Sequence, residues 1–311
     1  MTYNHAPYIV DAMNGFTMQE TTFPVYYLIT DDASTDGEPE VIKQYLADHF
    51  QSPYRTEDTD DYYLICAVHK TNPNCNFIVF FLKYNHYSIK KSKLPYQAEW
   101  RDNAKYIALC EGDDYWTHPR KLQMQYDFLE THPDYSMCCH NAIKLFMDTN
   151  TVRTFNEGIP TGVLTPGQIV DKWIIPTASM FYRIENLQYP EWLAKIYSGD
   201  MALYLRCMNN GRIFYSDSLM SVYRYSTKGM TASSRMKGKE IFIKEQQTML
   251  LESFNKGTNY RFDDVVGKKI KENYSFINYL KTINKSAILG YFTPYFIGKV
   301  INKIARIIKK K

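Results

Sequence analysis

Short apolar runs alternate with segments of helical periodicity through the first half of the chain. Residues 38–50 and 119–132 space their apolar side chains three and four positions apart, which predicts two helices. Strands are predicted for "VYYLIT" (25–30), "DYYLICAVH" (61–69), "FIVFFLKY" (77–84) and "KYIALC" (105–110). Such alternation is typical of an α/β fold with a mostly parallel sheet.

The second half is more mixed. Residues 199–211 predict a helix that Gly211 closes, and the chain becomes helical and polar from about residue 234. Further strands are predicted for "YSMCCHNAIKLF" (135–146), "TASMFYR" (177–183), "RIFYSD" (212–217) and "LMSVYRY" (219–225). We therefore expect one α/β domain followed by a helical extension.

Composition and residue spacing argue against a membrane-spanning protein and against a zinc protein. The 311 residues are 45% hydrophobic and 23% charged, which is ordinary for a globular chain. We expect no transmembrane span, because no run of eighteen apolar residues occurs. The seven histidines and six cysteines lack the spacing of a zinc site. Because the amino-terminal residues do not have the pattern of a secretion signal, reduced thiols and a cytoplasmic location are expected.

Charge is distributed unevenly along the chain. No acidic residue follows Glu272, whereas eight lysines and arginines do, so a net charge of +4 leaves residues 1–272 at −4. After Pro294, isoleucine and valine side chains fall on one helical face and basic ones on the other. This pattern predicts a peripheral helix on the anionic inner face of the cell membrane; an ordinary helix packed on the body is the alternative. No nucleic-acid recognition motif accompanies the charge, and we expect no such partner.

Two acidic clusters, "LITDDASTDG" and "ALCEGDDYW", follow apolar strands. Ligands of open α/β sheets bind beyond the carboxyl ends of strands, so both clusters suit one ligand. Glu111, Asp113 and Asp114 would repel one another unless a cation such as Mg²⁺ or Mn²⁺ joined them. An acidic turn before Pro119 is the alternative. Asp200 opens the helix at 199–211, where it can serve as an N-cap or as a general base.

Five segments together resemble the bacterial family 2 glycosyltransferases of surface-polysaccharide type. They are "TYNHAPYI", "DDASTD", "YIALCEGDDYWTHPRKLQMQ", "HPDYSMCCHNA" and "SGDMALYLRCMNNGRIFYSDSLMSVYR". The resemblance implies a GT-A (Rossmann-like) domain, with a mixed and mostly parallel sheet flanked by helices, over residues 1–232. Residues 233–311 would form the helical extension.

The resemblance also implies residue roles. Asp200 would be the catalytic base, and Asp114 with Asp113 would bind Mg²⁺ or Mn²⁺. The residues implied for the nucleotide-sugar donor are Thr2, Tyr3, Asn4, Asp32, Glu111 and Asp113. Those implied for the acceptor region are Trp116, Thr177, Ala178 and Ser179, although a buried aromatic is the favoured role of Trp116.

The activity so implied is inverting transfer of a sugar, with UDP-sugars the expected donors, to a hydroxyl of a glycan or lipid-linked acceptor. The alternative is a non-catalytic, membrane-associated assembly protein of the same fold, which the intact acids oppose. Ser226 stands where the family usually has a histidine. By this resemblance, the chain begins inside the segment that matches the family's first strand, at Met1–Thr2. We expect either that the true start of the protein lies earlier or that the sheet lacks a central strand.

Overall fold

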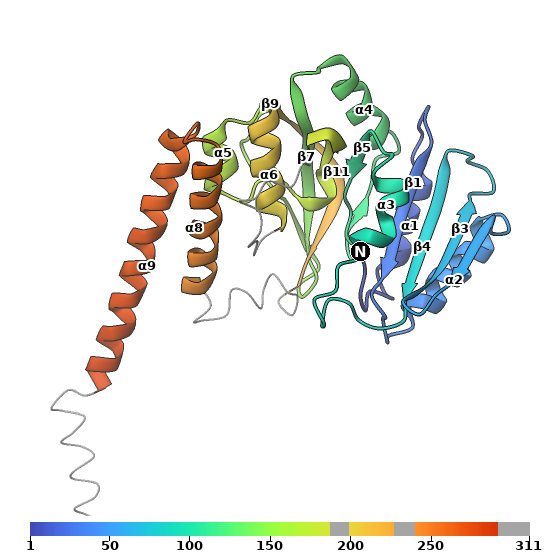
Figure 1. Ribbon diagram of the computed structural model, residues 1–311, viewed down its shortest axis with the longest axis horizontal. Helices are drawn as coiled ribbons and strands as arrows, with labels where there is room; N and C mark the ends of the chain where they lie inside the picture. Colours follow the sequence, from blue (N-terminus) through green and yellow to red (C-terminus); the bar gives the residue numbers. More distant parts are fainter. Residues whose placement is uncertain (187–198, 227–239, 292–311) are drawn as a thin grey trace, which may run out of the picture. The chain divides into compact units, whose positions relative to one another are not determined.

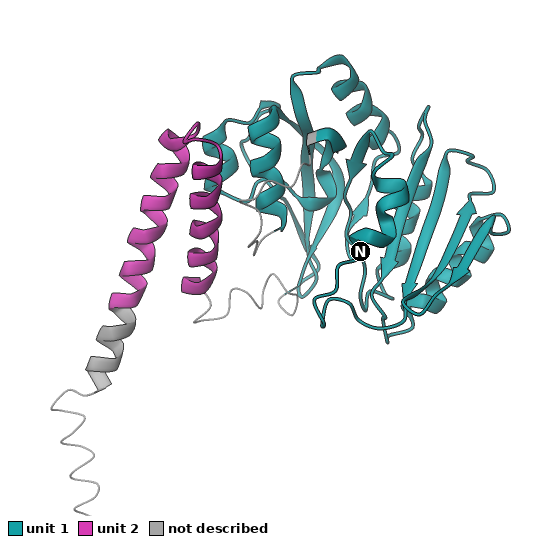
Figure 2. Ribbon diagram, in the orientation of Figure 1, with its two compact units in different colours: residues 1–189, 199–229 teal, residues 190–198, 230–311 magenta. Residues whose placement is uncertain are grey.

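The computed structural model describes residues 1–186, 199–226 and 240–291, and the chain divides into two compact units (Figure 2). Unit 1 comprises Met1–Tyr189 and Gly199–Gly229, and unit 2 comprises Pro190–Ser198 and Met230–Lys311. The predicted boundary at 232–233 and the predicted amphipathic helix after Pro294 lie outside the described residues.

Unit 1 is a mixed α/β structure whose strands form two sheets (Figure 1). The 4-stranded sheet has the order β1 (Val25–Asp31), β4 (Cys75–Leu82), β3 (Tyr62–Val68), β2 (Arg55–Asp58). The 7-stranded sheet has the order β5 (Tyr106–Ala108), β10 (Phe181–Arg183), β7 (Tyr135–Phe146), β11 (Arg212–Tyr225), β6 (Tyr115–Trp116). At its margins β8 (Thr151–Thr154) pairs with β7, and β9 (Gly162–Val163) pairs with β11.

The strand directions differ from the prediction. Among the described strands, β1–β4 and β7–β11 are the parallel pairs and the other pairs are antiparallel. A mostly parallel sheet is therefore not observed. The cause is the short connections, because residues 59–61 and 69–74 can join antiparallel neighbours, whereas a parallel crossover needs a dozen or more residues.

Most predicted elements are present, with two changes of boundary. Residues 212–217 and 219–225 form the single strand β11, whose pairing with β7 shifts register at Ser216 and Leu219. Residues 177–183 divide into the 3₁₀ turn η1 (Thr177–Ser179) and β10.

Helices cover the sheets of unit 1. Those that the sequence predicted are α2 (Glu38–His49), α4 (Lys121–Thr131) and α6 (Gly199–Asn210). Those that it did not predict are α1 (Ile9–Thr17), α3 (Leu94–Arg101), α5 (Pro166–Asp171) and the 3₁₀ turn η2 (Ile184–Asn186).

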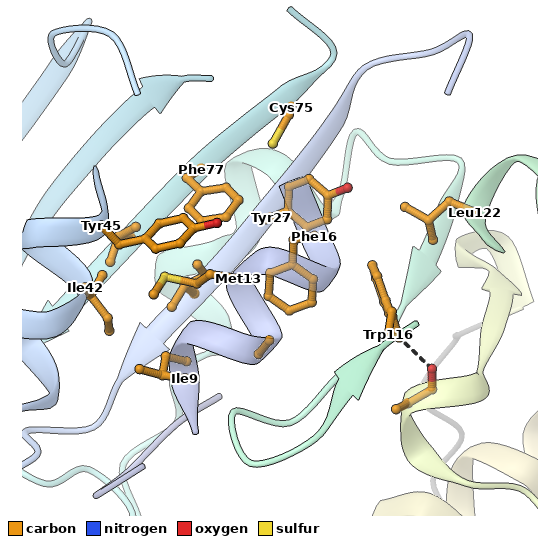
Figure 3. Packing of buried hydrophobic residues seen from close by; sticks show 14 of the residues in the cluster. Ile9, Met13, Phe16, Tyr27, Ile42, Tyr45, Cys75, Phe77, Trp116 and Leu122 are labelled. Carbon is orange, nitrogen blue, oxygen red and sulfur yellow. Dashed lines mark hydrogen bonds between the residues drawn. The ribbon is translucent and has the colours of Figure 1, made fainter. Parts of the chain in front are cut away.

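Helix α1 links the cores of the two sheets. It buries Ile9, Ala12, Met13 and Phe16 on one face, the spacing of an amphipathic helix. The Phe16 ring stacks on Tyr27 of β1 and meets Trp116 of β6 edge-on, both at 5.0 Å between ring centroids (Figure 3). Unit 2 contains α8 (Glu240–Gly257) and α9 (Asp263–Tyr291), which pack as a helical hairpin. Among the described helices, none is long and apolar enough to cross a membrane.

Candidate functional site

The acidic cluster lies in the loop between β5 and β6. Asp114 is 1% exposed; its Oδ1 accepts a hydrogen bond from the Arg224 backbone N–H at 2.8 Å, and its Oδ2 has no partner among the described residues. Burial, with Asp113 and Glu111 nearby, raises the pKa of Asp114 well above its ordinary value. A buried carboxylate with one oxygen that has no hydrogen-bond partner is the kind of group that a cation would stabilise.

Arg224 holds this loop against β11, a role that the sequence did not indicate. Its Nη1 donates to the Asp113 carbonyl oxygen at 2.8 Å, and its Nη2 forms an ion pair with Asp11 of α1. The guanidinium also lies over the rings of Tyr8 and Tyr115. Arg224 therefore fixes the backbone of the loop, while the carboxylate of Asp113 stays partly exposed.

Asp200 of α6 is electrostatically coupled to Glu111 of the same loop. The Thr177 hydroxyl donates to Asp200 Oδ2 at 3.4 Å, and burial raises the pKa of Asp200 although that hydrogen bond opposes the shift. Desolvation, and after it the carboxylates of Asp200 and Asp113, raise the pKa of Glu111 to about 7. Like charges shift each other in this way at short range, so α6 and the acidic loop share one electrostatic environment.

The backbone at Met1–Thr2 brings the two acidic clusters together. Thr2 N–H donates to the Thr30 carbonyl at the end of β1, and Asp32 N–H donates to the Thr2 carbonyl, both at 3.0 Å. On the other side, Gly112 N–H donates to the Met1 carbonyl at 3.3 Å. The expectation that both clusters could serve one ligand is thus geometrically possible.

Tyr3 and Asn4, which are also implied for the donor, are both exposed. Tyr3 is 45% exposed. Asn4 has a φ of 56° and is tied to the first acidic cluster by Thr35 N–H, which donates to its Oδ1 at 2.8 Å. His5, which the sequence analysis did not single out, places Nε2 4.0 Å from Asp113 Oδ2.

Asp32 is already fully engaged within the chain. It is 3% exposed, and its carboxylate accepts the N–H groups of His86 and Tyr87 at 2.8 and 3.1 Å. Lys93 forms a 2.6 Å ion pair with Asp32 Oδ2. A nucleotide base could reach this carboxylate after the 86–93 segment moved, so contact with the base stays a prediction.

The predicted acceptor residues divide into one that meets the site and three that are packed away from it. Trp116 is 3% exposed and its indole N–H donates to the Ala178 carbonyl at 2.8 Å, which confirms a core aromatic (Figure 3). Ala178 and Ser179 are fully buried. Thr177, through its contact with Asp200, is the member of the four that touches the site.

Comparison with known proteins adds distant likenesses. No model of a known protein family matches the chain. It is 28% identical over 239 residues to the uncharacterized proteins Mb1547 of Mycobacterium bovis and Rv1520 of Mycobacterium tuberculosis, covering 75% of this chain. The chain spans 60% of the length of these relatives. The crystal structure of S. aureus TarS is similar with a TM-score of 0.42 and 15% identity, over 88% of this chain and 53% of that one.

Asp113 and Asp114 are the residues of this site whose carboxylates could contribute to a cation site. No three His, Cys, Asp or Glu side chains of the described residues converge closely enough to enclose an ion by themselves. Mg²⁺ is commonly held by one or two carboxylates, with phosphate oxygens and water completing its octahedron. The unpartnered Oδ2 of Asp114 and the partly exposed carboxylate of Asp113 are compatible with that mode of binding.

Proposed function

We propose that this chain is an inverting glycosyltransferase that moves a sugar from a nucleotide-diphosphate donor to an acceptor hydroxyl. The observation that supports the proposal is the buried Asp114 carboxylate, whose Oδ2 has no hydrogen-bond partner among the described residues, in a loop whose Glu111 is electrostatically coupled to Asp200. The motif resemblance to family 2 glycosyltransferases, in register over about three quarters of the chain, supplies the reaction class. UDP-sugars are the first donors to test.

Asp200 would act as the general base. As the acceptor oxygen bonds to the anomeric carbon, its proton passes to Asp200, and the bond from that carbon to the diphosphate oxygen breaks with its electron pair. Inversion follows from this single displacement. A carboxylate whose pKa is raised by burial accepts a proton more readily at neutral pH, which suits Asp200 to the step.

Asp113 and Asp114 would hold Mg²⁺ or Mn²⁺ together with the donor diphosphate. When bound, the cation would offset the charge of the leaving nucleoside diphosphate. Arg224 keeps both acids in place through the loop backbone and the Asp114 carboxylate. The open side chain of Tyr3 and the ring of His5 would lie along the donor.

The acceptor is proposed to be a glycan or a lipid-linked glycan. The basic tail would hold the protein on the anionic inner face of the cell membrane, close to such an acceptor. Tail and membrane both rest on the sequence pattern, because residues 292–311 lie outside the described part of the chain.

Asp200→Asn tests the proposed base. Asparagine has the same shape but cannot accept the proton, so we expect transfer to fall by about 10²–10⁴-fold. Thermal stabilisation by nucleoside diphosphate with Mn²⁺ should be nearly unchanged. The matched control is Asp48→Asn, on the exposed face of α2, which should keep full transfer. Donor binding that falls as far as transfer would contradict the base role. No nucleotide-dependent shift in the wild-type protein would favour the non-catalytic alternative.

A further inference from the structure

The backbone of His5 is fixed on both sides of its side chain. The His5 N–H donates to Glu38 Oε2 at 2.9 Å. Its carbonyl oxygen accepts the N–H groups of Tyr8 and Ile9 at 2.8 and 2.9 Å, where α1 begins. The imidazole ring also meets the Tyr8 ring edge-on, at 6.4 Å between centroids. The base of the side chain is therefore held in place, although 26% of the side chain stays exposed.

Glu38 and Thr2 determine which ring nitrogen of His5 carries a hydrogen. Glu38 is fully buried, and the Thr2 hydroxyl donates to Glu38 Oε1. Because that hydroxyl has a single proton, the Thr2 oxygen can only accept from His5 Nδ1, which lies 3.3 Å away. In a neutral ring the hydrogen is then on Nδ1, and Nε2 keeps its lone pair. Histidines that bind metals are oriented in this way, with the other ring nitrogen donating to a neighbouring acceptor.

His5 Nε2 lies 4.0 Å from Asp113 Oδ2. A hydrogen bond between nitrogen and oxygen spans about 2.7–3.2 Å, so these two atoms are too far apart to bond to each other. Two ligands of a six-coordinate cation with bonds of about 2.1 Å lie about 3.0 Å apart when adjacent and about 4.2 Å apart when opposite. The observed separation falls within that range, so it suits two atoms that share one cation.

Gly112 lets the acidic loop pass close to the His5 ring. A Cβ at Gly112 would lie 3.0 Å from His5 Nδ1, which is tighter than ordinary van der Waals contact. Any larger residue would therefore press on the imidazole or move the loop away from it. The glycine thus keeps Asp113, the next residue along the chain, within reach of His5 Nε2.

We propose that His5 Nε2 binds the divalent cation beside Asp113, and that Glu38 and Thr2 are the positioning residues that keep this nitrogen free of a hydrogen. The inference rests on the cation of the proposed function and adds a preference among metals. Mg²⁺ prefers oxygen ligands, whereas transition metals accept imidazole nitrogen, so His5 favours Mn²⁺ over Mg²⁺. Since the described side chains do not enclose an ion by themselves, diphosphate oxygens and water complete the coordination.

The direct test is the electron spin echo of Mn²⁺ bound to the full chain, which detects a nitrogen nucleus bonded to the metal. We expect a nitrogen coupling in the wild-type protein, with Mn²⁺ alone and with Mn²⁺ plus UDP. His5→Gln should abolish the coupling and raise the Kd for Mn²⁺ by about tenfold or more, with a much smaller change in the Kd for Mg²⁺. The matched control is His49→Gln on the exposed face of α2, which should change neither the coupling nor either Kd.

Two substitutions of Thr2 test the positioning role. Valine has the shape of threonine but no hydroxyl, so the hydrogen of the His5 ring is no longer confined to Nδ1. Thr2→Val should therefore weaken Mn²⁺ binding by about 10–100-fold. Thr2→Ser keeps the hydroxyl and should keep most of the affinity. An equal Kd for Mn²⁺ in these two variants would refute the positioning role.

Two results would overturn His5 as a ligand: Mn²⁺ bound to the wild-type protein without a nitrogen coupling, or a coupling that persists in His5→Gln. Either result leaves the transferase proposal intact if UDP with Mn²⁺ still raises the melting temperature. A nitrogen coupling that depends on His5, without any effect of UDP, would support the metal ligand and count against the nucleotide donor. Failure of Mn²⁺ to bind, alone or with UDP, would overturn both.

Discussion

Gly112→Ala probes how closely the acidic loop is packed on Thr2. A Cβ at Gly112 would lie 2.7 Å from Thr2 Cβ, closer still to Thr2 Oγ1, and 3.0 Å from His5 Nδ1. Since carbon atoms pack best at about 3.5–4.0 Å, Thr2 or the loop would have to shift by roughly 0.8 Å. Thr2 resists such a shift because it is 4% exposed and bonded through its backbone to Thr30 and Asp32.

The expected cost of this substitution is that of overpacking a rigid site, about 1–3 kcal/mol. For a domain of this size each kcal/mol lowers the melting temperature by about 2–4 °C, so a fall of roughly 2–12 °C is predicted. The control is Gly199→Ala at the start of α6, where a Cβ would meet nothing within 4 Å. That change should leave the melting temperature the same or slightly higher, because alanine favours helix.

A double-mutant cycle with Thr2→Gly isolates the contact. Removing the Thr2 side chain removes two of the three atoms that a new Cβ would meet, so Gly112→Ala should cost at least ~1 kcal/mol less in that background. The free energies of unfolding would be measured by urea titration. An unchanged wild-type melting temperature after Gly112→Ala, or an equal cost in both backgrounds, would refute the packing described for this loop.

Three further predictions concern other parts of the chain. Burial lowers the pKa of Lys121, which lies over the Trp116 ring, to about 7, while the unfolded lysine keeps its proton up to about 10.5. Stability should therefore rise from pH 7 to 10.5, and Lys121→Met should flatten that rise in urea titrations; parallel profiles would contradict it. Arg224→Met keeps the backbone hydrogen bond to Asp114 but removes the guanidinium contacts with the Asp113 carbonyl and Asp11, so it should lower the unfolding free energy by about 2 kcal/mol and reduce the thermal shift given by Mn²⁺ with nucleotide. An equal thermal shift would argue against a role of the guanidinium in holding the loop. Removal of residues 294–311 should release the protein from anionic vesicles in a sedimentation assay, whereas unchanged binding would rule out the tail as the membrane contact.

Local periodicity predicted the elements that bury one clear face. Residues 135–146 form β7 as expected, and residues 38–49 form α2. The separation into two sheets could not be predicted in this way, because it depends on which strands meet across the fold. The direction of β3 was also mistaken, since alternating strands and helices were expected where a hairpin connection occurs.

In the candidate site, too, the acidic residues could be predicted from the sequence, whereas their contact partners could not. The acids of the β5–β6 loop and Asp200 could be chosen from the sequence, and they share one electrostatic environment in the structure. The partner of Asp32 could not, because Lys93 is 61 positions away and belongs to a loop without a periodic pattern. The role of Arg224 could not be predicted for a similar reason, because the sequence does not indicate which loop a basic residue in a strand will contact.

The sequence left two alternatives open: an acidic turn or a cation site for residues 111–114, and an N-cap or a general base for Asp200. These alternatives differ in the environment that each carboxylate needs. An acidic turn before α4 would leave its acids at the surface, whereas Asp114 is buried, has no partner for Oδ2 among the described residues and lies beside two more acids. Such a carboxylate lowers the stability of the empty protein, and a bound cation would reverse that cost. Asp200 likewise receives its hydrogen bond from Thr177 on another element, as a group positioned toward a site would. Binding at Asp114 and base catalysis at Asp200 therefore stay predictions, which the Mn²⁺-dependent thermal shift and the Asp200→Asn variant test.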